Sequence, residues 1–407
     1  MMAKKVTAIV FLIIIFIFGI GTVLRTFPAV SASLYLSSGS TLASGTETEN
    51  RQANKFSFDK KSINRINSII DLNVKGRNSW IDLNGGFQRG LGMTYVRDPG
   101  DIDVYKLDNG QLIYNLEKQD MKWYIRQLSD LDSYAQSSGN GPLLYVQLPF
   151  KVENDSLMPA GVNEYGNDNA DELLAGASKA GITTLDIRQL MHEEKIDFDK
   201  AFISTDQHWT PQTARWAANR ICSYARSKYD TPYNSSVFDP SAWNTKTYKD
   251  WFLGSLGKRT GRFFGGVSDF DILSPKIKTD FSFSAKAAKG QIKRSGSFEK
   301  ALLVPKNIET RNLFELNSYA AYIGGDYKIN TVTNRTADND CSVLLVRDSF
   351  SCAMQPFLCM NYKKVTAIDL RHYNEGTLKE HLADNKYDLI LVVYNPSAFS
   401  KEQFTFE

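Results

Sequence analysis

Five short runs of apolar residues constrain the fold of this chain more than any other feature. Runs of this kind, without regular polar alternation, are typical of strands buried on both faces of a parallel sheet. Patterns typical of amphipathic helices lie between them. The apolar runs cover residues 142–150, 182–187, 341–346, 364–370 and 389–395, and the clearest helical patterns cover 116–135, 171–181 and 212–227. The alternation predicts an α/β fold with helices on both faces of the sheet and ligands at the carboxyl ends of the strands.

The amino terminus predicts export. Lys4 and Lys5 precede an uncharged apolar stretch of 19 residues over 6–24. As a helix it would be about 28 Å long, close to the thickness of a bilayer core. It would be either a retained anchor with Lys4 and Lys5 inside, or a signal peptide cleaved near residues 29–32. Its length favours the anchor. We expect a single-pass protein of the cell membrane with its carboxy-terminal domain outside the cytoplasm, extracellular or periplasmic.

The composition along the chain predicts three regions. Residues 1–28 would be the anchor or signal. Residues 29–70 would be a polar stalk, since Ser, Thr, Gly, Asn and Glu dominate its first half. Residues 71–407 would form one catalytic domain. An insertion at about 233–340, rich in Lys, Ser, Phe and Gly, interrupts the alternation. We expect it to be irregular, partly antiparallel and packed beside the sheet, as a solvated cap or a surface for a sugar polymer.

Charge, cysteine and histidine counts exclude some functions. The chain has 48 Lys and Arg against 45 Asp and Glu, a net charge of +3. This balance argues against binding nucleic acid through bulk charge. The four cysteines form no CxxC pair, and in an exported chain both disulfides and buried free thiols remain open. Four histidines leave little room for a multi-histidine metal site, and no metal or organic cofactor is implied.

One segment with chemical potential is Ser204–Pro211. Thr210 followed by Pro211 is typical of a helix start, so Asp206 and His208 would lie on the loop before that helix. An Asp two residues from a His can orient the imidazole and leave its other nitrogen free to act as a base. The alternative is a purely structural loop contact.

A second segment is Leu344–Ser351, where a run of β-formers ends at Asp348 and Ser349 and a helical pattern follows. Ser349 would lie at a helix amino terminus, where N–H groups favour a developing oxyanion. The alternative is that Ser349 or Ser351 only caps the helix. A serine nucleophile needs a positioned base, and His208 with Asp206 would supply it. Spacing alone does not establish that these residues meet.

These segments carry a resemblance to a known family. Asp348-Ser349-Phe350 after a buried strand resembles the nucleophile block of SGNH/GDSL-type hydrolases. The block Asp206 to Trp209 precedes it, whereas ordinary SGNH enzymes carry their Asp/His block last. This permuted order resembles AlgX/AlgJ-like alginate O-acetyltransferases and DHHW proteins of bacteria, exported or membrane-anchored SGNH-like domains associated with exopolysaccharide acetylation. The resemblance covers about residues 75–407, including an Asn84-Gly85 turn and Gly254–Gly257. Gln207 replaces the second letter of DHHW.

The resemblance implies a fold and roles for particular residues. The fold would be a permuted three-layer, SGNH-like (flavodoxin-like) α/β domain. Ser349 would be the nucleophile, His208 the base and Asp206 its orienter. Other candidates are Asn395 as an oxyanion donor, Arg371 for an acyl or sugar oxygen, Trp209 for packing or sugar stacking, Tyr394 in the core or rim, Lys151 as a loop contact and His372 as a rival base.

The function implied is an O-acetyltransferase that modifies a cell-surface or secreted polysaccharide through an acyl-enzyme. Because the usual acetyl donors are cytoplasmic, a multi-spanning membrane O-acyltransferase partner would pass the acyl group across the membrane. Two alternatives remain open. One is a polysaccharide acetyl esterase with the same triad and water as the acceptor. The other is a non-catalytic polysaccharide-binding or assembly protein.

Overall fold

The computed structural model describes residues 20–24, 26–27, 74–97, 102–287 and 290–407. The chain divides into two units, Met1–Leu83 and Asn84–Glu407, with the boundary inside helix α3 (Arg77–Gly90). The part of the chain that is described contains no helix of sufficient length and apolarity to span a bilayer. Most of the predicted membrane helix over 6–24 and the predicted boundaries at 28 and 70 lie outside the described residues.

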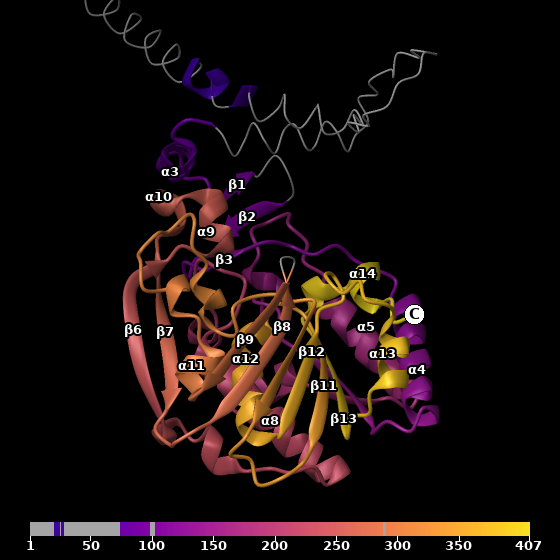
Figure 1. The fold of residues 1–407 in the computed structure, drawn as a ribbon. Helices are drawn as coiled ribbons and strands as arrows, with labels where there is room; N and C mark the ends of the chain where they lie inside the picture. The colour runs from indigo at the N-terminus through magenta and orange to yellow at the C-terminus, as the bar shows by residue number, and fades with distance from the viewer. Residues whose placement is uncertain (1–19, 25, 28–73, 98–101, 288–289) are drawn as a thin grey trace, which may run out of the picture. The chain divides into compact units, whose positions relative to one another are not determined.

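The second unit is built on an eight-stranded sheet with the order β5-β4-β13-β11-β12-β10-β8-β9 (Figure 1). Its first five strands run parallel to one another. They are β5 (Thr183–Asp186), β4 (Leu143–Gln147), β13 (Leu389–Tyr394), β11 (Ser342–Arg347) and β12 (Lys364–Ile368). Each corresponds to one of the five apolar runs, so the prediction of a buried parallel sheet is confirmed.

Helices cover both faces of this sheet, because successive strand side chains point to opposite sides. In β11, Val343 and Leu345 pack with helices α8 (Pro211–Tyr229) and α12 (Ser351–Asn361). Leu344 and Val346 belong to the other core. That core includes residues of α4 (Lys122–Ser137), α5 (Gly166–Lys179), α13 (Leu378–Asp384) and α14 (Lys401–Phe404). The α/β prediction is therefore confirmed at the level of a mixed sheet with helices on both sides.

The insertion at about 233–340 was predicted to be irregular, partly antiparallel and packed beside the sheet. At the other end of the sheet, part of this segment is regular. Strands β10 (Ile329–Asn334), β8 (Phe281–Ala287) and β9 (Gly290–Gly296) continue the main sheet as antiparallel strands. Phe281, Phe283 and Ala285 of β8 are buried, while the residues between them are partly exposed. Such alternation is typical of an antiparallel strand with one face on the core. This part of the segment therefore extends the sheet instead of packing beside it.

The remaining elements lie outside the main sheet. Strands β1 (Tyr95–Arg97), β2 (Asp103–Lys106) and β3 (Leu112–Ile113) form a small sheet, and β6 (Trp243–Phe252) pairs with β7 (Ser268–Pro275). The short helices are α6 (Ile187–Glu193), α7 (Phe198–Ala201), α9 (Gly254–Thr260), α10 (Arg262–Gly265) and α11 (Phe298–Leu302). Asn84 and Gly85 lie inside α3, so the predicted turn at these residues is wrong. Gly85 is needed there because a Cβ would lie 2.0 Å from the carbonyl oxygen of Thr260.

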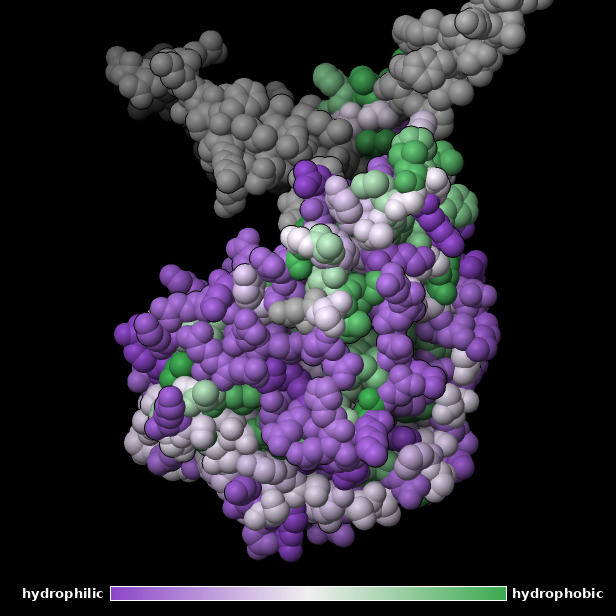
Figure 2. All heavy atoms as spheres, turned by 180° about the vertical axis from the view of Figure 1, so that it is seen from behind, coloured by the Kyte–Doolittle hydropathy of each residue, from purple (hydrophilic) through white to green (hydrophobic). Residues whose placement is uncertain are grey.

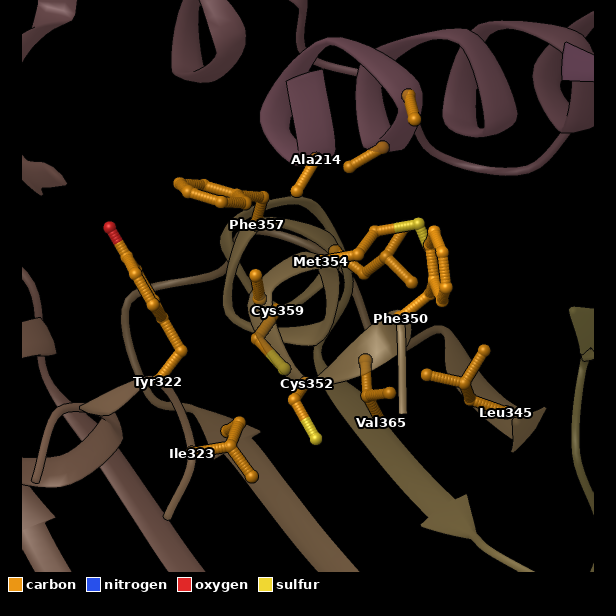
Figure 3. Packing of buried hydrophobic residues seen from close by; sticks show 14 of the residues in the cluster. Ala214, Tyr322, Ile323, Leu345, Phe350, Cys352, Met354, Phe357, Cys359 and Val365 are labelled. Atoms are coloured by element: carbon orange, nitrogen blue, oxygen red, sulfur yellow. The ribbon is translucent and has the colours of Figure 1, made fainter. Parts of the chain in front are cut away.

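Helix α12 is the centre of the larger core, and every one of its residues is buried. Figure 3 shows Phe357 and Met354 of α12 facing Ala214 of α8, with Val365 of β12 on the sheet side. Two cysteines, Cys352 and Cys359, also lie on this helix. These two, together with Cys222 and Cys341, are buried free thiols, which decides between the alternatives that the sequence left open.

We expect Phe357→Ala to destabilise the protein strongly. The Phe357 ring lies 5.0 Å from the Trp243 ring and 6.1 Å from the Tyr322 ring, and it is fully buried. Truncation would leave a cavity and lower the free energy of unfolding by about 3–5 kcal/mol. Denaturant unfolding measures this change. Ile277→Ala is the control, because Ile277 is 51% exposed and its truncation should cost within about 0.5 kcal/mol.

Candidate active site

The loop that carries Asp206 and His208 lies between α7 and α8 and is folded tightly on itself. The Ile203 N–H donates to the His208 carbonyl (3.0 Å), and the Asp206 N–H donates to the Ile203 carbonyl (3.1 Å). The loop ends where Thr210 caps α8 and Pro211 takes the first helical position, as the sequence predicted. These bonds fix the backbone, so the direction of both side chains follows from the fold.

Ser349 is the second residue after β11 and the second before α12, and it is partly exposed. Its Oγ lies 2.8 Å from Nε2 of His208, although the two residues are 141 positions apart in the chain. The other ring nitrogen of His208, Nδ1, contacts the Asp206 carboxylate. With Nδ1–H donating to Asp206, Nε2 is free to accept the serine proton. The structure thus brings Ser349, His208 and Asp206 together in one row.

The Asp206 carboxylate is buried and held by backbone donors. One oxygen accepts from the His208 N–H (3.0 Å), and the other accepts from the Ser255 N–H (2.6 Å). Burial by itself would raise the pKa of Asp206, but the His208 charge and these hydrogen bonds outweigh burial and hold the pKa well below its usual range. The carboxylate therefore stays ionised at neutral pH and stabilises a positively charged imidazole.

The Gly254–Gly257 motif, which the sequence singled out without a role, supplies one of these donors. Gly254 has a φ of 71°, and a Cβ there would lie 2.3 Å from the Thr205 carbonyl oxygen. Two residues beyond Ser255, the Gly257 N–H donates to the same carbonyl (2.9 Å). The glycine at 254 lets α9 approach closely enough for its N–H groups to hold the Asp206 loop.

Lys151 holds the same loop from the other side. Its buried Nζ donates to the carbonyl oxygens of Ile203 (2.6 Å), Ser204 (3.0 Å) and Asp206 (2.7 Å). Burial lowers the pKa of Lys151 to about 7, and the Asp206 charge opposes that shift. The sequence prediction of a loop contact is confirmed. The structure adds that this contact positions the residue beside the histidine.

Aromatic rings enclose the His208 imidazole. Tyr319 stacks on it with ring centroids 4.1 Å apart, and Phe350 lies 5.0 Å away in a tilted arrangement. The Tyr319 hydroxyl and the Trp209 Nε1–H both donate to the Phe350 carbonyl. Trp209 is completely buried, which contradicts a role in stacking on sugar and assigns it to packing. Sequence reasoning missed Tyr319, because no local pattern marks a single tyrosine in the insertion as a neighbour of His208.

Asn395 was predicted to be an oxyanion donor, but its hydrogen-bond partner is the Asp348 side chain. Its backbone N–H and its Nδ2 both donate to one oxygen of Asp348 at 2.7 Å, and the Phe350 N–H donates to the other oxygen. Asn395 is 1% exposed, so it holds Asp348 and does not face an incoming substrate. Burial raises the pKa of Asp348 to about 6, against the lowering effect of these hydrogen bonds and of the Arg371 charge.

The Ser349 N–H is the better candidate for an oxyanion donor. Within the described residues, no group accepts a hydrogen bond from it. It lies two residues before α12, an 11-residue helix whose amino-terminal N–H groups favour negative charge.

Two other predicted residues lie near this edge of the sheet. Tyr394 is completely buried and its hydroxyl donates to the Gln403 carbonyl, so it is a core residue and not a substrate contact. Arg371 pairs with Asp369 through Nε (2.9 Å) and Nη2 (2.6 Å), and its side chain is 29% exposed. A contact from Arg371 to an acyl or sugar oxygen stays a prediction.

One group of side chains has the spacing of metal ligands. Asp326, Asp369 and His372 each offer one atom, and these atoms lie within 4.8 Å of one another. Arg347 pairs with Asp326, however, and Arg371 pairs with both carboxylates. Two guanidinium groups thus balance two carboxylates, and the cluster gives no argument for a cation. His372 is the exposed histidine of this cluster, and among the described residues no hydrogen bond joins it to Ser349.

The chain is similar in sequence to one known protein family. Residues 116–247 match a family model described as an SGNH hydrolase-like domain, acetyltransferase AlgX. The resemblance to the AlgX-like SGNH family is confirmed. The matched range contains Lys151, Asp206 and His208 and ends before Ser349. No curated protein sequence matches the chain.

Solved structures share the fold. Two structures of Bacillus cereus PatB1, one of them with a sulfonyl adduct, have TM-scores of 0.64 and 0.62 and identities of 19% and 18%. They cover 75% of this chain and 100% and 99% of the PatB1 chains. A DHHW family protein from Eubacterium siraeum has a TM-score of 0.56 and 17% identity, and the match covers 77% of this chain and 96% of that one. At these identities the likeness establishes a shared fold alone.

We expect Asp206→Asn to lower stability in a pH-dependent way. A carboxyl whose folded pKa lies below its unfolded value near 4 stabilises the protein at neutral pH, and that contribution is lost progressively as the pH falls below about 4. The variant should be less stable than the wild type by about 2 kcal/mol at pH 7, because it loses a charged hydrogen bond. The difference should shrink by about pH 3.5.

Urea unfolding across this range measures the effect. Asp338→Asn is the control, because Asp338 is exposed. A difference between the wild type and Asp206→Asn that stayed constant from neutral to acidic pH would contradict the assignment of a depressed pKa to Asp206.

Proposed function

We propose that this protein is an extracytoplasmic O-acetyltransferase that modifies a cell-surface or secreted polysaccharide through an acetyl-enzyme on Ser349. One observation carries the proposal. The partly exposed Ser349 hydroxyl lies 2.8 Å from a histidine nitrogen whose partner nitrogen contacts a buried, ionised carboxylate. The AlgX-like family match over residues 116–247 supports the choice of acetyl transfer.

In the first half of the reaction, the Ser349 Oγ attacks the carbonyl carbon of an acetyl donor while Nε2 of His208 takes the hydroxyl proton. The negative charge on the carbonyl oxygen is held by the Ser349 N–H, two residues before α12. When the bond between the carbonyl carbon and the leaving group breaks, His208 returns the proton to the leaving atom. Asp206 stabilises the imidazolium throughout and does not itself take the proton.

In the second half, a sugar hydroxyl replaces the leaving group. His208 removes its proton, the sugar oxygen attacks the acetyl carbon, and the ester bond to Ser349 breaks. Ser349 recovers its proton from His208, and the glycan leaves with one acetyl ester. The acceptor alone separates this reaction from hydrolysis, because water in place of the sugar hydroxyl would give acetate.

The proposal extends to location and partner. The apolar stretch over residues 6–24 would tether the domain to the outer side of the membrane. A multi-spanning membrane O-acyltransferase would pass the acyl group to Ser349. The PatB1 structure with a sulfonyl adduct supports testing sulfonyl electrophiles on this chain, since they react with activated hydroxyl groups.

The direct test is the fate of an acetyl group. Full-length protein is incubated with a chromogenic acetyl ester, with and without glycan oligosaccharides, and mass spectrometry follows acetyl on the Ser349 peptide and on the glycan. We expect transfer by the wild type and its loss in Ser349→Ala and His208→Ala. For Asp206→Asn we expect a fall in kcat of about 10³–10⁴-fold. Ser397→Ala is a matched serine control.

Each outcome has a separate meaning. Acetyl on the glycan that requires both Ser349 and His208 would support the transferase. Ester hydrolysis that ignores every glycan would favour the acetyl esterase. Equal behaviour of wild type and Ser349→Ala in all assays would reject the serine mechanism and favour a non-catalytic polysaccharide-binding protein.

A second prediction concerns Lys151. Lys151→Met keeps the length of the side chain but leaves three carbonyl oxygens without their donor. The Asp206 loop should lose its fixed position, so kcat for the acetyl ester should fall by about 10²-fold while KM changes little. The exposed Lys278→Met is the control. An unchanged kcat in a folded Lys151→Met protein would show that the loop does not depend on this ammonium group.

A further inference from the structure

A tyrosine from the insertion covers one flat side of the His208 imidazole. Tyr319 lies in the short 3₁₀ helix η5 (Ser318–Ala321). Its ring makes an angle of only 16° with the His208 ring, and the two centroids are 4.1 Å apart. Asp206 contacts Nδ1 and Ser349 lies at Nε2. Polar groups therefore hold the edge of the imidazole, and the Tyr319 ring holds its flat side.

The Tyr319 residue is itself fixed at two points. Its hydroxyl donates to the carbonyl of Phe350 (2.8 Å), the residue that follows Ser349. Its backbone N–H donates to the Asn317 side chain (3.1 Å), which caps η5. Burial raises the pKa of Tyr319 well above its usual value, so the hydroxyl stays neutral and remains a donor. The ring therefore has a defined position beside the reactive serine.

Helix α9 positions both the segment of Tyr319 and the carboxylate of Asp206. The Ser255 N–H near the start of α9 donates to Asp206 (2.6 Å). The Nζ of Lys258, three residues further along, donates to the Leu316 carbonyl (2.8 Å), just before η5. The carboxylate and the ring contact the imidazole from different directions, and one short helix binds the segments that carry them.

Tyr319 does not offer a surface on which a sugar could stack, because the residue is only 2% exposed. The face of the molecule in Figure 2 has a largely hydrophilic surface, and its hydrophobic side chains gather mainly at the end that carries α10. The Tyr319 ring instead makes its contacts inside the fold. A role for this residue must therefore act through the groups that it touches, and the nearest of these is His208.

We propose that Tyr319 is a positioning residue whose ring holds His208 at the angle at which Nε2 faces the Ser349 hydroxyl. This inference rests on the proposed function, since it gives the ring a part in the same serine mechanism. An imidazole bound through Nδ1 alone can still tilt about that hydrogen bond, and a stacked ring opposes the tilt. When Nε2 takes the serine proton, the imidazole becomes a cation, which the face of an aromatic ring attracts.

The test compares variants that keep the ring with variants that lose it. Tyr319→Phe keeps the stacked ring and loses only the hydroxyl, whereas Tyr319→Leu and Tyr319→Met fill the space without a ring. Tyr233→Leu is the matched control, because Tyr233 also stacks on a ring, that of Phe238, and donates its hydroxyl to Asn219 (2.8 Å). Denaturant unfolding identifies the variants that fold, and two ringless replacements keep the comparison possible if one of them does not.

The first measurement is the rate at which Ser349 in the full-length protein reacts with phenylmethanesulfonyl fluoride, followed by mass spectrometry of the Ser349 peptide. The serine oxygen forms a bond to sulfur, fluoride leaves, and His208 takes the proton. We expect the ringless variants to react about 30-fold more slowly than the wild type, and Tyr319→Phe and Tyr233→Leu to stay within about threefold of it. With the chromogenic acetyl ester, the same loss should appear in kcat while KM changes little.

The second measurement is the NMR signal of the His208 Cε1–H in full-length protein labelled with ¹³C-histidine. The chain has only four histidines, and the loss of one signal in His208→Ala assigns it. A stacked aromatic ring moves this signal upfield. We expect the upfield position in the wild type and in Tyr319→Phe, and its loss in the ringless variants. An unchanged signal in a folded ringless variant, or an unchanged reaction rate despite a changed signal, would overturn the proposal.

Failure of this proposal is distinguishable from failure of the proposed function. A wild type whose Ser349 reacts no faster than Ser397 would reject the serine mechanism, and the role of Tyr319 would fall with it. A reactive wild type with an equally reactive Tyr319→Leu would reject the role of Tyr319 alone. A protein that hydrolyses acetyl esters without transfer to glycans, and whose Ser349 loses its reactivity in Tyr319→Leu, would support the role of Tyr319 and favour the esterase.

Discussion

The buried ammonium group of Lys151 fixes the loop on which the candidate site depends. Three carbonyl oxygens between Ile203 and Asp206 converge on it, and a lysine ammonium has three N–H donors to satisfy them. Without this group, the carbonyls would face a dry interior without partners. With it, the loop backbone has one arrangement, and His208 points at a serine on a distant part of the chain. The chemistry at Ser349 thus depends on a contact that involves no reacting atom.

A second polar contact joins the two central strands beneath the serine. Asp348 follows β11 and Asn395 follows the neighbouring strand β13, and the amide and the backbone of Asn395 both bind the Asp348 carboxylate. The residues around Ser349 are therefore fixed to the sheet on one side and to α12 on the other. Such support from neighbouring groups holds reacting atoms within the narrow limits that acyl transfer requires.

Sequence reasoning succeeded where the signal is local. Each of the five apolar runs contains a parallel strand, and Thr210 with Pro211 begins α8, because strand burial and helix capping depend on neighbouring residues. It failed where long-range packing decides. Trp209, Tyr394 and Asn395 follow or adjoin reactive segments, yet their burial depends on elements far away in the sequence. Tyr319 lies in the segment expected to be irregular, and only the folded chain brings it onto His208.

The sheet order determines how much of the chain must be present before the Ser349 site can form. β13 comes last among the strands in the sequence, yet it lies between β4 and β11 in the middle of the sheet. If the proposed export holds, the residues after the amino-terminal stretch cross the membrane in chain order, and β4 and the His208 loop would be outside long before that strand follows. Until β13 inserts, Asp348 lacks Asn395, and β11 has no neighbour that joins it to β4. The serine would thus gain its base only once nearly the whole chain has been delivered, so unfinished molecules would not consume acyl groups during export.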